Sequence, residues 1–150
     1  MVTATSSLSF PGSSRSFAPL GVGTWAWGDK STWGMGGYDT GISEATIAEA
    51  FDASLEAGVT LFDTAEVYGD GESERIIGRL LKGDPARRER ALIATKFMPA
   101  PWKLNVRTAL RSALEASLER LGVDRVDLYQ LHGPVSLRSH SALADALAEV

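Results

Sequence analysis

The sequence of 150 residues contains no cysteine. This absence excludes disulfides, zinc–thiolate sites, iron–sulfur clusters and thiol catalysis. No apolar run approaches the ~20 residues that a membrane-spanning helix needs. Basic side chains are not in excess, since 15 Lys and Arg stand against 19 Asp and Glu. We therefore expect no nucleic-acid partner and no membrane partner, and we assign no metal ligands.

Acidic side chains are missing from the N-terminus, where the first is Asp29. The Ser- and Thr-rich opening is similar in composition to part of an organelle transit peptide, but it holds a single basic residue, Arg15, and no helical periodicity. We favour a flexible N-terminus over 1–7 and a hairpin over 8–19, with strands Leu8–Phe10 and Phe17–Leu20 around a Pro-Gly-Ser-Ser turn. The expected compartment is the cytoplasm, with the chloroplast as the alternative.

Beyond the hairpin, short apolar runs alternate with longer segments of helical periodicity. The predicted strands are Leu20–Trp25, Val59–Asp63, Ala91–Lys96 and Val126–His132. The predicted helices are Ser43–Ala57, Glu72–Lys82, Asn105–Leu121 and a fourth that begins near Ser139 and is still running at Val150. This order predicts right-handed βαβ units and a parallel sheet, either open and doubly wound or closed as a (β/α)8 barrel.

Three of the four predicted strands end in a chemically active residue, namely Asp63, Lys96 and His132. A fourth candidate, Tyr68, lies on the loop after Asp63. Each has an ordinary alternative, since an Asp can cap a turn, a Lys can be solvated, a His can be structural and a Tyr can pack in a loop. In parallel architectures, however, the carboxyl ends of the strands meet at one rim, where ligands bind. The joint pattern therefore predicts a site.

Together these side chains predict a general acid. A tyrosine titrates near pH 10, and a lysine ammonium beside it would stabilise the phenolate form. A carboxylate would hold that lysine, and a histidine could orient a substrate carbonyl or relay a proton. The sequence offers no nucleophile, and hydride from a nicotinamide would fill that role. A different hypothesis pairs Asp63 and Glu66 as the two carboxylates of a barrel glycosidase.

Four segments resemble the aldo-keto reductases: PLGVGTWAWGD (19–29), EAGVTLFDTAEVYGDGESERIIGRLL (56–81), LIATKF (92–97) and SLERLGVDRVDLYQLHGP (117–134). The pattern is most similar to plant and cyanobacterial members. The resemblance implies a (β/α)8 TIM barrel whose bottom is closed by an N-terminal β-hairpin, with the first four βα units present in this chain.

By this resemblance the protein reduces an aldehyde or ketone to an alcohol with NADPH. Its catalytic residues would be Tyr68 as proton donor, Lys96 and Asp63 as the supporting pair, and His132 as the residue that orients the substrate. Gly133 follows His132, where many relatives carry a bulky aromatic residue, so the resemblance does not define the pocket beside it.

The resemblance also implies ligand contacts. Gly23, Thr24, Trp25 and Asp63 would lie at the cofactor. Trp25, Trp27 and Trp102 would line the substrate mouth, although loop packing explains these tryptophans equally well. The groups that select NADPH over NADH lie in the second half of the barrel in this family, so NADPH is an expectation inherited from the resemblance.

Two expectations concern the whole protein. A regulatory or sensor subunit that binds the cofactor on the same scaffold is the alternative to an enzyme, because a fold does not determine a function. A complete barrel needs about 250 residues, so we expect residues 1–150 to be its N-terminal half, ending inside the fourth helix. We expect the complete protein to be a monomer or homodimer, and the isolated segment to be inactive.

Overall fold

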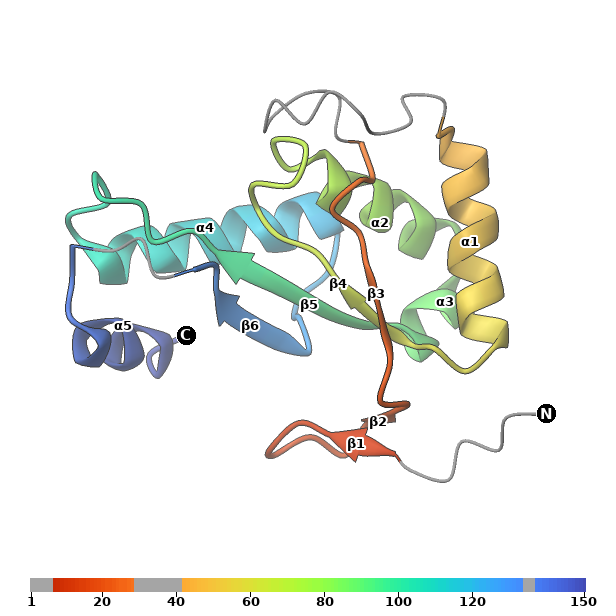
Figure 1. Cartoon of the computed structure of the whole chain (residues 1–150), viewed down its shortest axis with the longest axis horizontal. Helices are drawn as coiled ribbons and strands as arrows, with labels where there is room; N and C mark the ends of the chain where they lie inside the picture. The colour runs from red at the N-terminus through yellow and green to blue at the C-terminus, as the bar shows by residue number, and fades with distance from the viewer. Residues whose placement is uncertain (1–6, 29–41, 134–136) are drawn as a thin grey trace.

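The computed structural model describes residues 7–28, 42–133 and 137–150. Its centre is a four-stranded parallel sheet in the order β3-β4-β5-β6 (Figure 1). The strands are β3 (Gly21–Gly23), β4 (Leu61–Asp63), β5 (Leu92–Phe97) and β6 (Leu128–Leu131). Strands that are consecutive along the predicted βα units are also neighbours in the sheet. The predicted parallel order is therefore confirmed, although each strand begins later than expected.

Helices lie between consecutive strands of the sheet, and one more follows the last strand (Figure 1). They are α1 (Glu44–Glu56), α2 (Glu72–Gly83), α3 (Pro85–Arg90), α4 (Val106–Leu121) and α5 (His140–Leu147). Among the helices that the sequence predicted, three are capped by side chains that accept backbone N–H bonds, with Ser43 before α1, Asn105 before α4 and Ser139 before α5. These boundaries agree with the sequence prediction to within one residue.

Two helical predictions need correction. Helix α3 was not predicted, because its six residues bury no side chain and carry no apolar period. Local chemistry starts it instead, with the Asp84 carboxylate accepting from the Ala86 N–H and Pro85 in the first turn. The fourth predicted helix does not run on to Val150. It ends at Leu147, and a turn from the Val150 N–H to the Leu147 carbonyl replaces the next helical bond.

The N-terminal hairpin is confirmed, with shorter strands than predicted. Strands β1 (Leu8–Ser9) and β2 (Ser16–Phe17) pair antiparallel. Arg15 holds the hairpin against the main sheet, since its guanidinium pairs with Asp127 at 2.7 Å and donates to the carbonyl of Ala91 at 3.0 Å. Both partners directly precede strands of the sheet. The hairpin therefore covers the amino ends of the strands, opposite the end where ligands bind in this architecture.

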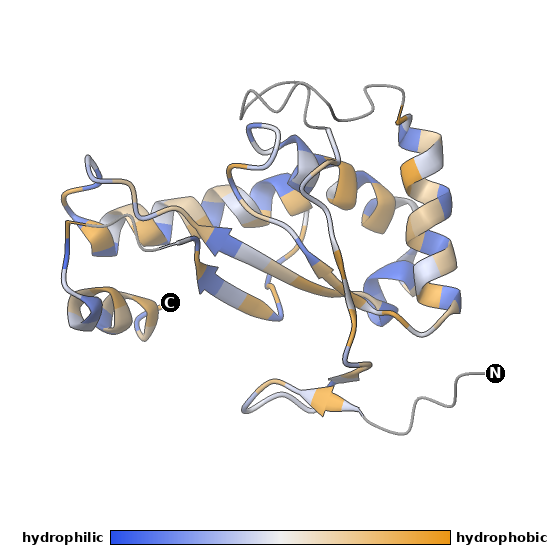
Figure 2. Ribbon diagram, viewed as in Figure 1, coloured by the Kyte–Doolittle hydropathy of each residue, from blue (hydrophilic) through white to orange (hydrophobic). Residues whose placement is uncertain are grey.

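The core lies between the sheet and the helices, where apolar residues line the strands and the inner helix faces (Figure 2). Its first cluster joins α1 and α2 to β4, and the rings of Phe51 and Phe62 stack there with centroids 4.1 Å apart. A second cluster packs α4 and α5 around Phe97 of β5. In the part of the chain that the structure describes, no helix is long and apolar enough to cross a bilayer.

Candidate active site

The structure brings the four predicted catalytic side chains together at the carboxyl ends of the strands. Asp63 is the last residue of β4, Lys96 lies near the end of β5 and His132 directly follows β6. The Lys96 ammonium donates to Asp63 Oδ2 at 2.7 Å and to Tyr68 Oη at 3.2 Å. The rings of Tyr68 and His132 meet edge to face, with centroids 5.4 Å apart.

Lys96 is the hub of this arrangement. Its third donor bond goes to the carbonyl oxygen of Thr64 at 2.9 Å, so all three ammonium protons have acceptors. The Lys96 side chain is 13% exposed and that of Asp63 is 38% exposed. The ammonium is thus held in one place with its charge balanced. Sequence reasoning did not single out Thr64, because a backbone acceptor leaves no signal in residue type.

The loop after β4 carries Tyr68 to Lys96 because its backbone turns back sharply. Gly69, Asp70 and Gly71 have φ values of 57°, 55° and 81°, which lie in the left-handed region that favours glycine. The Tyr68 N–H donates to the Ala65 carbonyl at 3.1 Å, and the Gly71 N–H donates to the Tyr68 carbonyl at the same distance. These two bonds fix the Tyr68 backbone at the rim.

His132 is held by its backbone and its ring faces the tyrosine. Its N–H donates to the Phe97 carbonyl at 2.7 Å. Burial lowers the pKa of His132, and the Lys96 charge lowers it further, against weaker opposite effects of Asp63 and Glu66. The imidazole is therefore neutral at pH 7. Its Nδ1 is buried and has no hydrogen-bond partner among the described residues.

Gly133 occupies a position that a larger residue could not adopt without strain. Its φ is 82°, in the left-handed region. A bulky aromatic residue with this backbone would meet the steric cost that glycine avoids.

Glu66 supports the rim rather than serving as a second reactive carboxylate. Its Oε1 accepts the Met98 N–H at 2.6 Å and the Lys103 ammonium at 3.0 Å. These bonds tie the Tyr68 loop to the segment after β5. Asp63 and Glu66 are therefore each engaged in an ion pair with a lysine, Asp63 with Lys96 at 2.7 Å and Glu66 with Lys103 at 3.0 Å. A glycosidase needs two carboxyl groups that flank a bound sugar, and this geometry argues against that hypothesis.

The predicted cofactor residues are placed differently from one another. Gly23 ends β3 and is exposed beside Asp63, its partner in the sheet register. Thr24 is fully buried, and both its N–H and its hydroxyl donate to the Asp63 carbonyl, at 3.0 and 3.1 Å. The Thr24 hydroxyl is therefore turned into the protein. Trp25 is half-buried. Contact of these residues with a cofactor stays a prediction.

The tryptophans predicted at the substrate mouth also differ in burial. Trp27 is 8% exposed and packs on Phe51 and Phe62, with ring centroids 6.4 and 6.3 Å away. The structure thus shows Trp27 packed in the core, as the packing alternative has it, and its contact with a substrate stays a prediction. Trp102 is 79% exposed on the segment after β5. Trp25 and Trp102 remain predicted substrate contacts.

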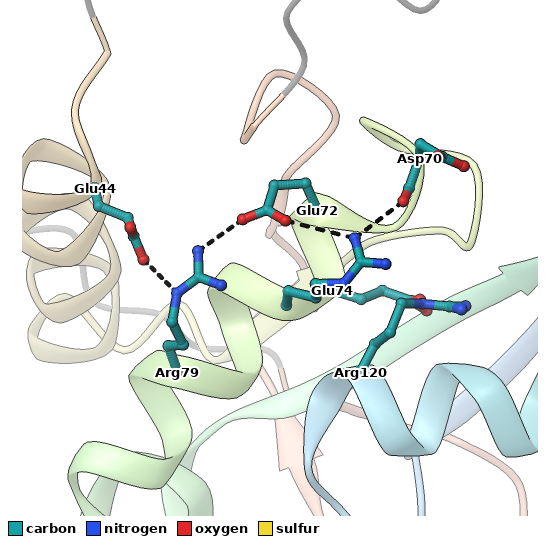
Figure 3. A network of polar contacts seen from close by, with 7 residues as sticks. Glu44, Asp70, Glu72, Glu74, Arg79 and Arg120 are labelled. Atoms are coloured by element: carbon teal, nitrogen blue, oxygen red, sulfur yellow. Dashed lines mark hydrogen bonds and ion pairs between the residues drawn. The ribbon is translucent and has the colours of Figure 1, made fainter.

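A surface network of ion pairs joins α1, α2 and the Tyr68 loop (Figure 3). Arg79 bridges Glu44 of α1 at 2.5 Å and Glu72 of α2 at 2.7 Å. Arg75 donates to Glu72 at 3.5 Å and to the Asp70 carbonyl at 3.1 Å. The hydrogen bond from Arg79 lowers the pKa of Glu72. These groups are exposed, so each pair stabilises the fold only weakly.

Known proteins are similar to this chain in sequence and in fold. Pyridoxal reductase of the Arabidopsis thaliana chloroplast is 40% identical over 124 residues, covering 78% of this chain and 33% of that protein. Glycerol dehydrogenase from Gluconobacter oxydans superposes with a TM-score of 0.74 at 32% identity, over 99% of this chain and 45% of that one. An aldo-keto reductase from Klebsiella pneumoniae, solved with NADPH, superposes with a TM-score of 0.69 at 28% identity. The match covers 89% of this chain and 41% of that one.

This chain spans between one third and one half of the length of these relatives. The solved neighbours are (β/α)8 barrels, and the hairpin and four βα units described above correspond to part of that barrel. The sequence model of the aldo/keto reductase family matches residues 19–150, which include the strand-end site. The chain belongs to the aldo/keto reductase family.

Proposed function

We propose that the protein carrying this chain reduces an aldehyde or ketone to an alcohol with NADPH, and that Tyr68 is the general acid. The observation that supports this most directly is the Lys96 ammonium, which lies 3.2 Å from Tyr68 Oη and 2.7 Å from Asp63 Oδ2. A cation at this distance favours the negative charge that the phenol oxygen acquires when it gives up its proton. Asp63 and the Thr64 carbonyl keep that cation in place.

The residues at the rim fit a nicotinamide cofactor. An acid poised for a carbonyl oxygen needs a reductant for the carbon, and none of the described side chains beside Tyr68 is of a type that can supply hydride. Bound NADPH would supply that hydride. Gly23 presents exposed backbone next to Asp63, whose side chain is 38% exposed despite its ion pair. These residues and Trp25 are the ones in this chain that would hold the cofactor. The Thr24 side chain would support them from beneath.

The chain's own residues then have distinct tasks in the reaction. Tyr68 Oη donates its proton to the carbonyl oxygen, and Lys96 stabilises the phenolate that remains. His132 is neutral, so it orients the carbonyl through a hydrogen bond without adding a second positive charge beside Lys96. Exposed Trp102 provides an apolar surface near the rim for the rest of the substrate.

The decisive test is loss of the phenol hydroxyl in the natural protein that carries this chain. Tyr68→Phe should lower kcat for NADPH oxidation with an aldehyde panel by about 10²- to 10⁴-fold, the usual contribution of a general acid. NADPH affinity, measured by cofactor fluorescence, should stay unchanged. Tyr129→Phe is the matched control, because its hydroxyl contacts the Leu110 carbonyl at 3.4 Å and takes no part in the site.

The outcomes separate the hypotheses. Equal rates for Tyr68→Phe and the unaltered protein would overturn the role of Tyr68. NADPH binding without turnover of any aldehyde or ketone would favour the regulatory or sensor subunit. We further propose a monomer or homodimer and a cytoplasmic location, with the chloroplast as the alternative because one relative is a chloroplast protein. Sedimentation and localisation of a tagged protein check these two points.

A further inference from the structure

Beneath the rim lies a network of buried polar groups that the proposed reaction does not use. In the part of the chain that the structure describes, six polar or charged residues are fully buried. All six belong to two hydrogen-bonded groups that meet in the first turn of α2, at adjacent residues. They are Thr24, Thr64, Ser73, Glu74, Thr95 and Ser117. No other polar or charged residue of the described ranges is buried as a whole, so their concentration here calls for a reason.

The three threonines stand next to residues of the site. Thr24 follows Gly23, Thr64 follows Asp63 and Thr95 precedes Lys96. Successive side chains of a strand point to opposite faces. At the ends of β3, β4 and β5, each residue on the site face is therefore the sequence neighbour of a threonine on the helix face.

Ser73 joins the first two strand ends. Its hydroxyl lies 2.8 Å from Thr24 Oγ1 and 3.0 Å from Thr64 Oγ1, and it donates to the Thr24 carbonyl at 2.9 Å. The Ser73 N–H also donates to the Tyr68 carbonyl at 3.3 Å. One residue thus contacts two strand ends and the loop that carries the general acid.

Glu74 joins the third strand end to α4. One carboxylate oxygen accepts the Thr95 hydroxyl at 2.6 Å, and the other accepts Arg120 Nε at 2.6 Å. Figure 3 shows the Glu74 side chain reaching toward Arg120 across the two helices. Arg120 in turn donates to Ser117 at 3.0 Å. The carboxylate is fully buried, with 0% exposure, against 20% for Arg120.

Stability alone gives a weak reason for this ion pair. Burying a carboxylate costs several kcal/mol, and well-packed apolar side chains often serve a core equally well. Hydrogen bonds to a buried charge differ from apolar contacts because they define direction and register. The network connects to the reacting groups, since Lys96 donates to the Thr64 carbonyl at 2.9 Å. A shift of Thr64 or Thr95 would therefore displace the ammonium from Tyr68.

We propose that Ser73 and Glu74 are positioning residues, which hold the ends of β3, β4 and β5 through Thr24, Thr64 and Thr95 and so set the place of Lys96 relative to Tyr68 and Asp63. This inference deepens the proposed function and rests on it for its kinetic consequence. Ser73 and Glu74 touch neither substrate nor cofactor, and they act through the strands and the Tyr68 loop.

The test compares two substitutions of one threonine in the natural protein. Thr95→Val keeps the shape and removes the hydroxyl that Glu74 accepts, whereas Thr95→Ser keeps the hydroxyl. We expect Thr95→Val to lower kcat at least 10-fold, because small displacements of catalytic groups cost up to about 10²-fold in rate. KM and NADPH affinity should change less than 2-fold, a threshold chosen to separate chemistry from binding. Thr95→Ser should restore kcat, and Thr108→Val on the exposed face of α4 serves as control.

A second measurement keeps the inference testable without turnover. His132 lies beside Tyr68 and its pKa responds to the Lys96 charge, so its NMR titration reports on the position of the ammonium. Thr95→Val and Ser73→Ala should both move the His132 titration midpoint, and Thr95→Ser should not. If Thr95→Val melts at a lower temperature but keeps its kcat and its His132 titration, the network is structural only and the inference fails. If the unaltered protein has no reductase activity, the proposed function fails while the titration still decides the positioning role.

Discussion

Two glycines of α2 should respond in opposite directions to the same substitution. Both lie within the helix, where Ala is favoured over Gly by about 1 kcal/mol. At Gly83 an added Cβ would meet no atom within 4 Å. At Gly78 it would lie 2.5 Å from the Arg120 carbonyl oxygen and 2.9 Å from that of Leu121. Helix α4 ends against α2 at this point, and backbone oxygens cannot rotate out of the way.

The magnitude follows from the two opposing effects. Gly83→Ala should raise the free energy of unfolding by about 0.5–1 kcal/mol, through helix propensity and a less flexible unfolded chain. Gly78→Ala has the same gain, but overpacking against a rigid neighbour costs about 1–3 kcal/mol. The helices must also separate, which pulls Arg120 away from Glu74 and adds the cost of an unpaired buried carboxylate, about 3–5 kcal/mol if the ion pair breaks. We therefore expect Gly78→Ala to be less stable than Gly83→Ala by at least about 1 kcal/mol, and by more if the Glu74–Arg120 pair breaks.

Urea denaturation of the natural protein, followed by tryptophan fluorescence, measures this difference as a separation of the two unfolding midpoints at a common slope. Far-ultraviolet circular dichroism of the folded variants serves as a control for the helix content. The reasoning would be refuted if Gly78→Ala matched or exceeded Gly83→Ala in stability. That result would mean that α4 does not approach Gly78 as closely as 2.5 Å implies.

Further predictions concern the site, the hairpin and the sheet edges. His132 should titrate below its ordinary value of 6.5, as followed by NMR. Because the pKa of His132 is lower in the folded state, the unfolded chain binds more protons. The contribution of His132 to the free energy of unfolding is therefore present above about pH 6.5 and should be lost as the pH falls through the folded pKa. Arg15→Met should lower the free energy of unfolding in urea by about 2–3 kcal/mol, since it leaves Asp127, whose side chain is only 10% exposed, without its cation. Arg107→Met removes an exposed pair with Glu149 and should lower it by less than about 1 kcal/mol. Expressed by itself, the segment 1–150 should self-associate and lack reductase activity, because β3 and β6 are the edge strands of the sheet that the described residues form. A monomeric, active 150-residue chain would contradict this.

The sequence by itself determined the order of the sheet strands and of every helix except α3, and it predicted the four polar side chains that meet at the rim. Helix boundaries at Ser43, Asn105 and Ser139 follow from side chains that compete for backbone N–H groups, which is local chemistry. Polar residues at successive strand ends predict a shared rim, because the carboxyl ends of parallel strands lie at the same edge of the sheet. Helix α3 was not predicted. It has a local start signal, but the prediction of helices also relied on an apolar period, and α3 has none.

The tertiary structure alone decided which groups touch and which are buried. Trp27 and Trp102 are the same residue type in similar loops, yet one lies in the core and the other is 79% exposed, because burial depends on the elements that pack against each loop. Likewise, no sequence pattern shows that Glu74 reaches Thr95 across 21 positions, or that the Thr64 carbonyl faces Lys96. Local propensities act over a few residues, whereas these contacts arise from the register of the sheet and the approach of α2 and α4, which only the folded chain brings together.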